Sequence, residues 1–171
     1  MCIRDSHNAG ITTKKNAVVA EHKLSNLDKA FHPSKEHFHT YSGAGFNIKD
    51  IDHAGYSEAG NKVYKLPAYM SSSHNKDVAI NFAKRNREED RPIQILHWEH
   101  EKDQPLAVIG KHSAFRHEHE TLVPRTDATP EKYHAEHIGT SRYTDNDDNQ
   151  YEVHHLRRIP KTEVKKTKPK I

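Results

Sequence analysis

Short apolar runs separated by glycine, proline and charged breaks are the feature that most limits what this chain can fold into. Alternation of apolar and polar residues over about four to eight positions is typical of strands. Such runs occur at 37–42, 63–66, 68–72, 93–98, 106–109, 118–123, 133–138 and 151–159, and we expect 63–72 to form one strand interrupted near Pro67. Helical spacing occurs at 15–31, ahead of Pro33, and at 75–84. We therefore predict an α+β domain dominated by sheet.

The composition predicts one domain with a small core. The chain has 171 residues, of which 33% are hydrophobic and 30% charged, which leaves room for one core and flanking tails. Residues 1–6 have the character of a cloning or assembly scar, and we expect the natural chain to begin further upstream. We assign 7–36 to an N-terminal helical segment, 37–160 to the domain and 161–171 to a basic disordered tail.

Charge and cysteine content exclude several classes of protein. The net charge is +3, and the basic excess lies at the C-terminal end, so the sequence favours no nucleic-acid partner. Cys2 is the only cysteine, which excludes a disulfide framework and fits a reducing compartment. No apolar run approaches the roughly 18 residues of a membrane helix, and no secretory signal is evident. We expect a soluble protein with no membrane contact.

Two polar motifs are candidates for chemistry. The run 71–73 is three serines at a predicted strand end, and Glu118 and Glu120 are one residue apart. On a strand both carboxylates project to the same face, where two like charges favour a site that handles a cation. The simpler alternatives are a helix N-terminal cap for the serines and solvated surface charges for the glutamates.

Three blocks in one order carry a resemblance to a known family. Two further segments, 77–83 and 120–125, resemble the helix and the strand that follow the second and third blocks. The chain resembles the mono-ADP-ribosyltransferases of the arginine-serine-glutamate class, in particular forms associated with tailed bacteriophages, over roughly 38–125. The three blocks are Tyr41-Ser42-Gly43, Ser71-Ser72-Ser73 and Glu118-His119-Glu120.

The resemblance implies a fold, a substrate and site residues. The expected fold is two facing antiparallel sheets that form a cleft for NAD, with helices on the flanks, and NAD is a substrate. Glu120 is expected to hold the ribose and stabilise its oxocarbenium-like transition state, with Ser71 orienting Glu120. The cofactor-binding residues are expected to be Tyr41, Ser42, Gly43, Ser71, Ser73, Phe82 and His39, although Phe82 and Tyr41 have core packing as the alternative.

The acceptor is expected to be an arginine side chain. A guanidinium is always protonated and needs a carboxylate to bind it and to take a proton, a role that the resemblance assigns to Glu118. The loop 111–117 would contact the acceptor, with Phe115 as its aromatic residue. The expected setting is a phage enzyme, monomeric, in the virion or the host bacterial cytoplasm, that modifies host proteins.

One position departs from the family pattern. Ser42 stands where the family has its arginine, and His39, two residues earlier on the same strand face as Tyr41, is a candidate substitute. This departure leaves open a virion or binding module that keeps the fold without NAD chemistry. An NAD glycohydrolase and a His-based metal protein are the other rival functions.

Histidine is abundant, with 16 residues. None of the histidine groups has the His-Glu-x-x-His helix spacing of a zinc site, so we predict no metal site and place most of these residues on the surface.

Overall fold

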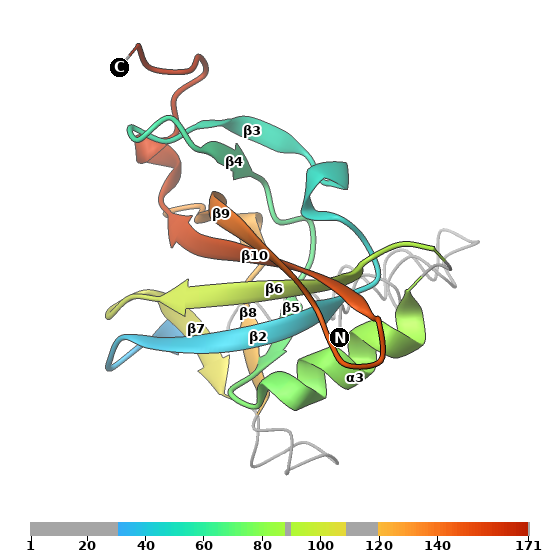
Figure 1. Ribbon diagram of the computed structural model, residues 1–171. Helices are drawn as coiled ribbons and strands as arrows, with labels where there is room; N and C mark the ends of the chain where they lie inside the picture. The colour runs from blue at the N-terminus through green and yellow to red at the C-terminus, as the bar shows by residue number, and fades with distance from the viewer. Residues whose placement is uncertain (1–30, 88–89, 109–119, 171) are drawn as a thin grey trace, which may run out of the picture.

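A computed structural model of the protein describes residues 31–87, 90–108 and 120–170 (Figure 1). The strands are β1 (His32–Pro33), β2 (Phe38–Ala44), β3 (His53–Tyr56), β4 (Lys62–Tyr64), β5 (Met70–Ser73), β6 (Ile93–His100), β7 (Pro105–Val108), β8 (Glu120–Val123), β9 (His134–Thr144) and β10 (Gln150–Ile159). Within these residues the helices are α3 (Lys76–Asn86) and three single 3-10 turns, η1 (Ile48–Asp50), η3 (Thr126–Ala128) and η4 (Lys161–Glu163). The predicted α+β class is confirmed, with sheet dominant.

The strands form a continuous order, β1-β7-β8-β5-β2-β6-β10-β9-β4-β3. The two halves of this order meet at a single residue pair, Tyr41 of β2 opposite Ser73 of β5. We predicted two facing sheets. The strands instead form two groups, β1-β7-β8-β5 and β2-β6-β10-β9-β4-β3, which are joined at this one residue pair. The expectation that all pairs are antiparallel is wrong for β6 and β10, which run parallel, because the intervening chain passes through β7, β8 and β9 before it returns beside β6.

Strand β6 lies between β2 and β10, and its apolar residues are buried on both faces. Ile93 and Ile95 pack on one side of the sheet with helix α3, while Leu96 and Trp98 pack on the other side in the main core. This pattern confirms the prediction of a strand at 93–98, since a strand covered on both faces reads as an apolar run rather than as a simple alternation.

Helix α3 follows β5 directly and packs against β2 and β6 (Figure 1). Its N-cap is Asn75, whose side chain accepts a hydrogen bond from the amide of Asp77. Its apolar face presents Ala79 and Ala83 to the sheet, and both are fully buried. The predicted helix at 75–84 is therefore confirmed, with its packing face.

The prediction of one interrupted strand at 63–72 is wrong. Strand β4 pairs with β3 and β9, whereas β5 pairs with β2 and β8 in the other group of strands. The chain leaves the group of strands that contains β4 at Leu66, whose backbone forms hydrogen bonds with Thr126 instead of with a neighbouring strand. Pro67 has no N–H to donate to a ladder, which favours this crossing between the two groups.

The C-terminal segment has a defined place up to residue 170. The backbones of Lys165 and Tyr56 exchange hydrogen bonds, which covers the free edge of β3. This contact corrects the expectation of a disordered tail, because it shows part of that segment paired to the sheet. The predicted helix at 15–31 lies, except for its last residue, outside the described residues. Within the described segments no helix is both long and apolar enough to cross a membrane.

Candidate active site

The centre of the candidate site is a hydrogen bond between Ser71 and Glu120. Strands β5 and β8 pair so that Ser73 lies opposite Glu120 and Ser71 opposite Leu122. Ser71 is buried and its hydroxyl donates to Oε1 of Glu120, which is itself only half-buried. The contact that the resemblance implies is thus present, with a buried serine bonded to a carboxylate at the end of a strand, and the catalytic roles of the two residues stay predictions.

The other two serines of the run bond to backbone groups. The hydroxyl of Ser72 donates to the carbonyl of Thr121, 2.8 Å away, and ties β5 to β8. The hydroxyl of Ser73 accepts from the amide of Asn75 at 3.0 Å and so supports the entry into α3. The helix-cap alternative is correct in part, since Ser73 assists the cap while Asn75 is the N-cap residue.

Tyr41 lies on the same face of the sheet as Glu120. Ser73 is opposite Glu120 on one side and opposite Tyr41 on the other, and directly paired residues project to the same face. Two strand spacings place the backbones of Glu120 and Tyr41 about 10 Å apart. The amine of Lys76, from the first turn of α3, is 5.9 Å from the centre of the Tyr41 ring, so this half-buried ring has a cation above it.

Ser42 points to the opposite face. It is 2% exposed, its hydroxyl donates to the carbonyl of Ser71 at 2.8 Å, and it accepts from the indole N–H of Trp98 at 3.0 Å. Both polar functions of the hydroxyl are used inside the core. The expectation that the Ser42 side chain contacts NAD is therefore not supported by its position; its observed role is to hold the backbone of Ser71.

Gly43 is required by the packing of helix α3. A Cβ on Gly43 would overlap the carbonyl oxygen of Ala79 and come within 2.9 Å of the amide nitrogen of Ala83. The close approach of helix and strand therefore explains the glycine without any ligand, and the predicted nicotinamide contact of its backbone stays a prediction.

The remaining predicted residues fall in different places. His39 is exposed on β2, with Nδ1 2.9 Å from Nε2 of His97. Phe82 is half-buried on α3. Glu118, Phe115 and the loop 111–117 lie outside the described residues, so the acceptor assignments stay predictions.

A cavity of about 380 Å³ lies on the face of the sheet opposite to Tyr41. Phe38, His74 and Leu106 are among its lining residues, and His74 follows Ser73 directly in the chain. The rings of Phe38 and His74 are 5.2 Å apart and nearly parallel. This hollow reaches the end of β5 through His74, and neither Ser71 nor Glu120 lines it.

Sequence reasoning placed most histidines on the surface, but the structure shows two organised groups. One is half-exposed on the face of Tyr41 and Glu120, and contains His39, His97 and His155. No spacing within the chain marks it, because its members come from three different strands. Across the described residues no group of three or more His, Cys, Asp or Glu side chains is arranged to hold a metal ion.

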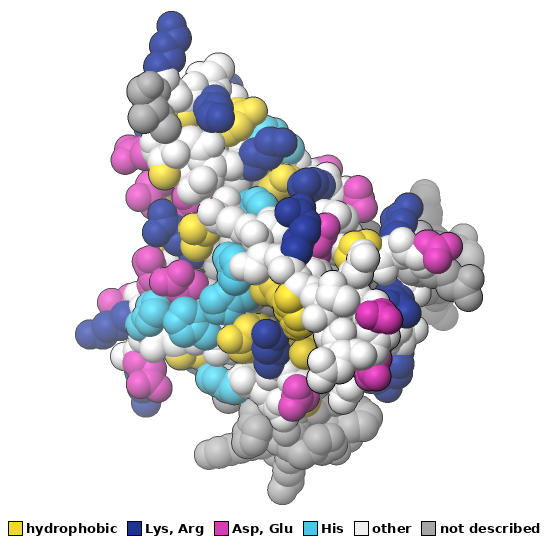
Figure 2. All heavy atoms as spheres, viewed as in Figure 1, with side chains coloured by type: hydrophobic (Ala, Val, Ile, Leu, Met, Phe, Trp, Pro, Cys, Tyr) yellow, Lys and Arg dark blue, Asp and Glu magenta, His cyan; other side chains and the backbone are white. Residues whose placement is uncertain are grey.

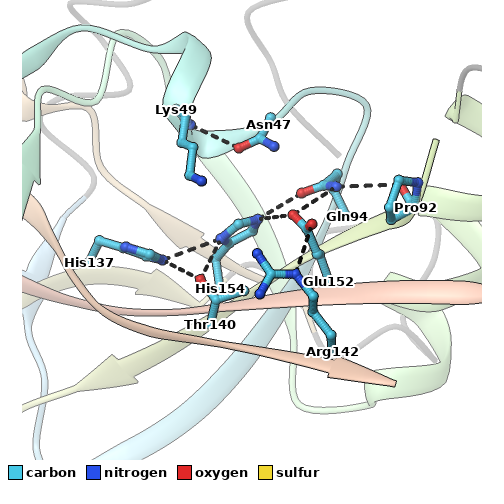
Figure 3. A network of polar contacts seen from close by, with 9 residues as sticks. All are labelled: Asn47, Lys49, Pro92, Gln94, His137, Thr140, Arg142, Glu152 and His154. Atoms are coloured by element: carbon cyan, nitrogen blue, oxygen red, sulfur yellow. Dashed lines mark hydrogen bonds and ion pairs between the residues drawn. The ribbon is translucent and has the colours of Figure 1, made fainter. Parts of the chain in front are cut away.

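The second group is internal (Figure 3). His154 is fully buried, and its Nε2 lies 2.7 Å from Oε1 of Gln94 while its Nδ1 lies 3.3 Å from the Thr140 hydroxyl and from Nε2 of His137. Burial, and then the neighbouring His137, lower the pKa of His154 to about 4. A neutral imidazole that donates from Nε2 and accepts at Nδ1 satisfies these contacts, which makes this group a structural one.

Comparison with known proteins supports the fold. No protein-family model matches the chain, and no curated protein matches its sequence. Among solved structures, Vis toxin, an ADP-ribosyltransferase from Vibrio splendidus, superposes with a TM-score of 0.59 at 17% identity over 95% of this chain and 68% of its own. Plx2a, an ADP-ribosyltransferase toxin from Paenibacillus larvae, gives 0.56 at 14% over 91% and 80%. The ADP-ribosylating toxin BECa of Clostridium perfringens, solved with NADH, gives 0.57 at 12% over 88% and 37%.

These likenesses, all at low identity, show that the chain has the fold of bacterial ADP-ribosyltransferase toxins.

Proposed function

We propose that the protein is an NAD-dependent mono-ADP-ribosyltransferase that transfers ADP-ribose to arginine side chains and releases nicotinamide. The observation that carries the proposal is the Ser71–Glu120 hydrogen bond, which fixes a carboxylate at the end of β8 within a fold shared with ADP-ribosyltransferase toxins. BECa solved with NADH and exoenzyme S of Pseudomonas aeruginosa solved with carba-NAD support a dinucleotide substrate for this fold.

The chemistry needs a fixed negative charge. The bond between the ribose C1′ and the nicotinamide nitrogen breaks with its electron pair going to nicotinamide, so positive charge grows on the ribose. The Glu120 carboxylate stabilises this charge, and Ser71 removes the reorientation that would otherwise accompany it. The acceptor nitrogen then bonds to C1′ and gives up a proton to a base.

Arginine as the acceptor is supported by two observations. Glu118 stands two residues before Glu120, where a carboxylate could bind the guanidinium and take its proton. Vis has been solved with agmatine, a guanidinium compound. On this basis we place the protein in the Glu-x-Glu class. The proposed setting is the one that the sequence resemblance implies, a phage enzyme in the virion or the host bacterial cytoplasm that modifies host proteins.

A catalytically silent module is the second candidate, favoured by the absence of the family arginine. Ser42 is buried at that position and carries no charge to offer a phosphate. Calorimetric titration with NAD separates the two readings: no binding at millimolar NAD favours the silent module. A glycohydrolase would release nicotinamide without labelling protein.

The central experiment is incubation with labelled NAD and bacterial lysate, followed by mapping of the modified residues. Glu120→Gln should abolish labelling because the amide carries no charge, while Glu58→Gln, at an exposed turn between β3 and β4, should leave it unchanged. Glu118→Gln should lose arginine labelling but keep some NAD hydrolysis. Normal labelling by Glu120→Gln would refute the assignment, and equal loss of both activities in Glu118→Gln would refute the division of roles.

A further inference from the structure

Three imidazoles form a hydrogen-bonded row across neighbouring strands, and Figure 2 shows histidine side chains gathered on this face. Nδ1 of His39 on β2 lies 2.9 Å from Nε2 of His97 on β6. Nδ1 of His97 lies 2.8 Å from Nδ1 of His155 on β10, and Nε2 of His155 lies 2.8 Å from the hydroxyl of Ser141 on β9. We call these three residues the histidine row.

The histidine row continues the line of residues that contains Glu120. The pairings Glu120–Ser73, Ser73–Tyr41, Tyr41–His97 and His97–His155 connect five strands one after another, with the single pair of β5 and β2 as the link between the two groups of strands. Directly paired residues share a face, so the carboxylate and the histidine row lie on the same side of the sheet. Three strand spacings separate Glu120 from His97, about 14 Å between backbones, which a dinucleotide can span.

The hydrogen bonds of the row are satisfied with or without one extra proton. In the neutral row each contact needs one hydrogen, so the bonds point in a single direction between His39 and Ser141. If His97 is doubly protonated, it donates to both neighbours, each of which accepts at Nδ1 and keeps its hydrogen on Nε2. The outer Nε2–H of exposed His39 then points away from the row, as a donor with no acceptor within it.

Charges around the row come from every element next to it. Burial, and then the neighbouring imidazoles His155 and His39, lower the pKa of His97 to about 4, with Glu99 acting in the opposite direction and Lys76 in the same direction. Charge repulsion from the neighbouring imidazoles is thus part of what disfavours a proton on His97 in the free protein. An anion bound beside it would oppose both effects. Of the other titratable groups nearby, His37 on β2 lies beside His39 and contacts Glu99 at 3.2 Å. His137, His100 and His74 lie toward the opposite face of the sheet, from which His137 and His100 interact with members of the row through charge alone.

We propose that the histidine row, with Lys76, binds the diphosphate of the dinucleotide and takes up a proton as it does so. This inference rests on the proposed function. The protonated histidine row and Lys76 supply the positive charge that Ser42 cannot. The bound anion raises the pKa of His97. The affinity for NAD is therefore highest below the pKa of His97 in the free protein, and it falls as the pH rises through the pKa of His97 in the complex. NAD binding therefore strengthens as the pH falls.

The test is calorimetry of NAD and of inorganic diphosphate at pH 6.5 in MES and in imidazole, two buffers of different ionisation enthalpy. We expect uptake of about 0.5–1 proton per ligand, and a Kd about tenfold lower at pH 6 than at pH 8. His97→Asn should remove the proton uptake and weaken binding at pH 6 about tenfold. His155→Asn is the second variant should His97→Asn fail to fold, and His53→Asn, exposed on β3, is the matched control.

The outcomes separate the two proposals. NAD binding without proton uptake, unchanged in His97→Asn, would overturn the histidine row and leave the transferase standing. Diphosphate binding with proton uptake but no NAD binding would support the row and refute the transferase. Binding of neither ligand, or stoichiometric zinc bound at the row in place of diphosphate, would overturn the row.

Discussion

Removal of the Ser42 hydroxyl should destabilise the fold and disturb the candidate site together. The hydroxyl accepts from the Trp98 indole at 3.0 Å and donates to the Ser71 carbonyl at 2.8 Å, with Trp98 fully buried. In Ser42→Ala the indole N–H is left buried without an acceptor, which costs about 1–3 kcal/mol, and the lost donor adds about 1 kcal/mol. We expect the free energy of unfolding to fall by about 2–4 kcal/mol and Tm by about 5–10 °C.

Urea unfolding followed by far-UV circular dichroism measures this change, because the signal survives replacement of the tryptophan. In a Trp98→Phe background the indole donor is absent, so Ser42→Ala should cost about 1–2 kcal/mol less than in the native background. A cost below about 0.5 kcal/mol, or an equal cost in both backgrounds, would refute the reasoning. In the folded Ser42→Ala protein, NAD turnover should also fall, since the Ser71 backbone loses its support.

Two further predictions concern helix packing and pH. Gly43→Ala should lower the free energy of unfolding by about 1–3 kcal/mol because the new Cβ meets the backbone of α3. Gly139→Ala, which has open space around the new Cβ, should leave the free energy of unfolding unchanged or raise it by up to about 1 kcal/mol. The measurement is the midpoint of urea unfolding, compared between variants whose transitions have the same slope, and equal effects of the two substitutions would contradict the packing account. The lowered pKa of buried His154 means that the unfolded chain binds the proton first, so stability is full above pH 6.5 and falls toward pH 4, by at most about 3 kcal/mol for this residue. The free energy of unfolding measured at a series of pH values should show this fall, and the fall should be smaller in His154→Gln. An equal pH dependence in both proteins would show that His154 does not cause it.

Local patterns predicted individual elements well. The apolar run at 93–98 and the spacing at 75–84 became β6 and α3, because burial of a strand or a helix face depends on residues close in sequence. The prediction at 63–72 was wrong because a local pattern does not indicate which strands a segment pairs with. Two runs separated by Pro67 read as one strand, yet they pair in different groups of strands.

The contacts of the candidate site also differ in whether the sequence could predict them. The Ser71–Glu120 contact was predicted, but only through the order of three motifs, since the two residues are 49 positions apart. The histidine row was not predicted at all, because His39 and His97 are 58 positions apart and meet only through the register of β2 and β6. A one-residue shift of either strand would place them on opposite faces.

By itself the sequence determined the strand and helix segments, the absence of a disulfide framework, and the motifs that carry the resemblance. Only the tertiary structure decided that Ser42 turns inward to Trp98, that Gly43 is required by α3, and that the histidines join the line of Glu120. The physical reason is the range of the interactions. Element formation follows from neighbours along the chain, whereas strand register and helix approach bring together groups that no local spacing relates.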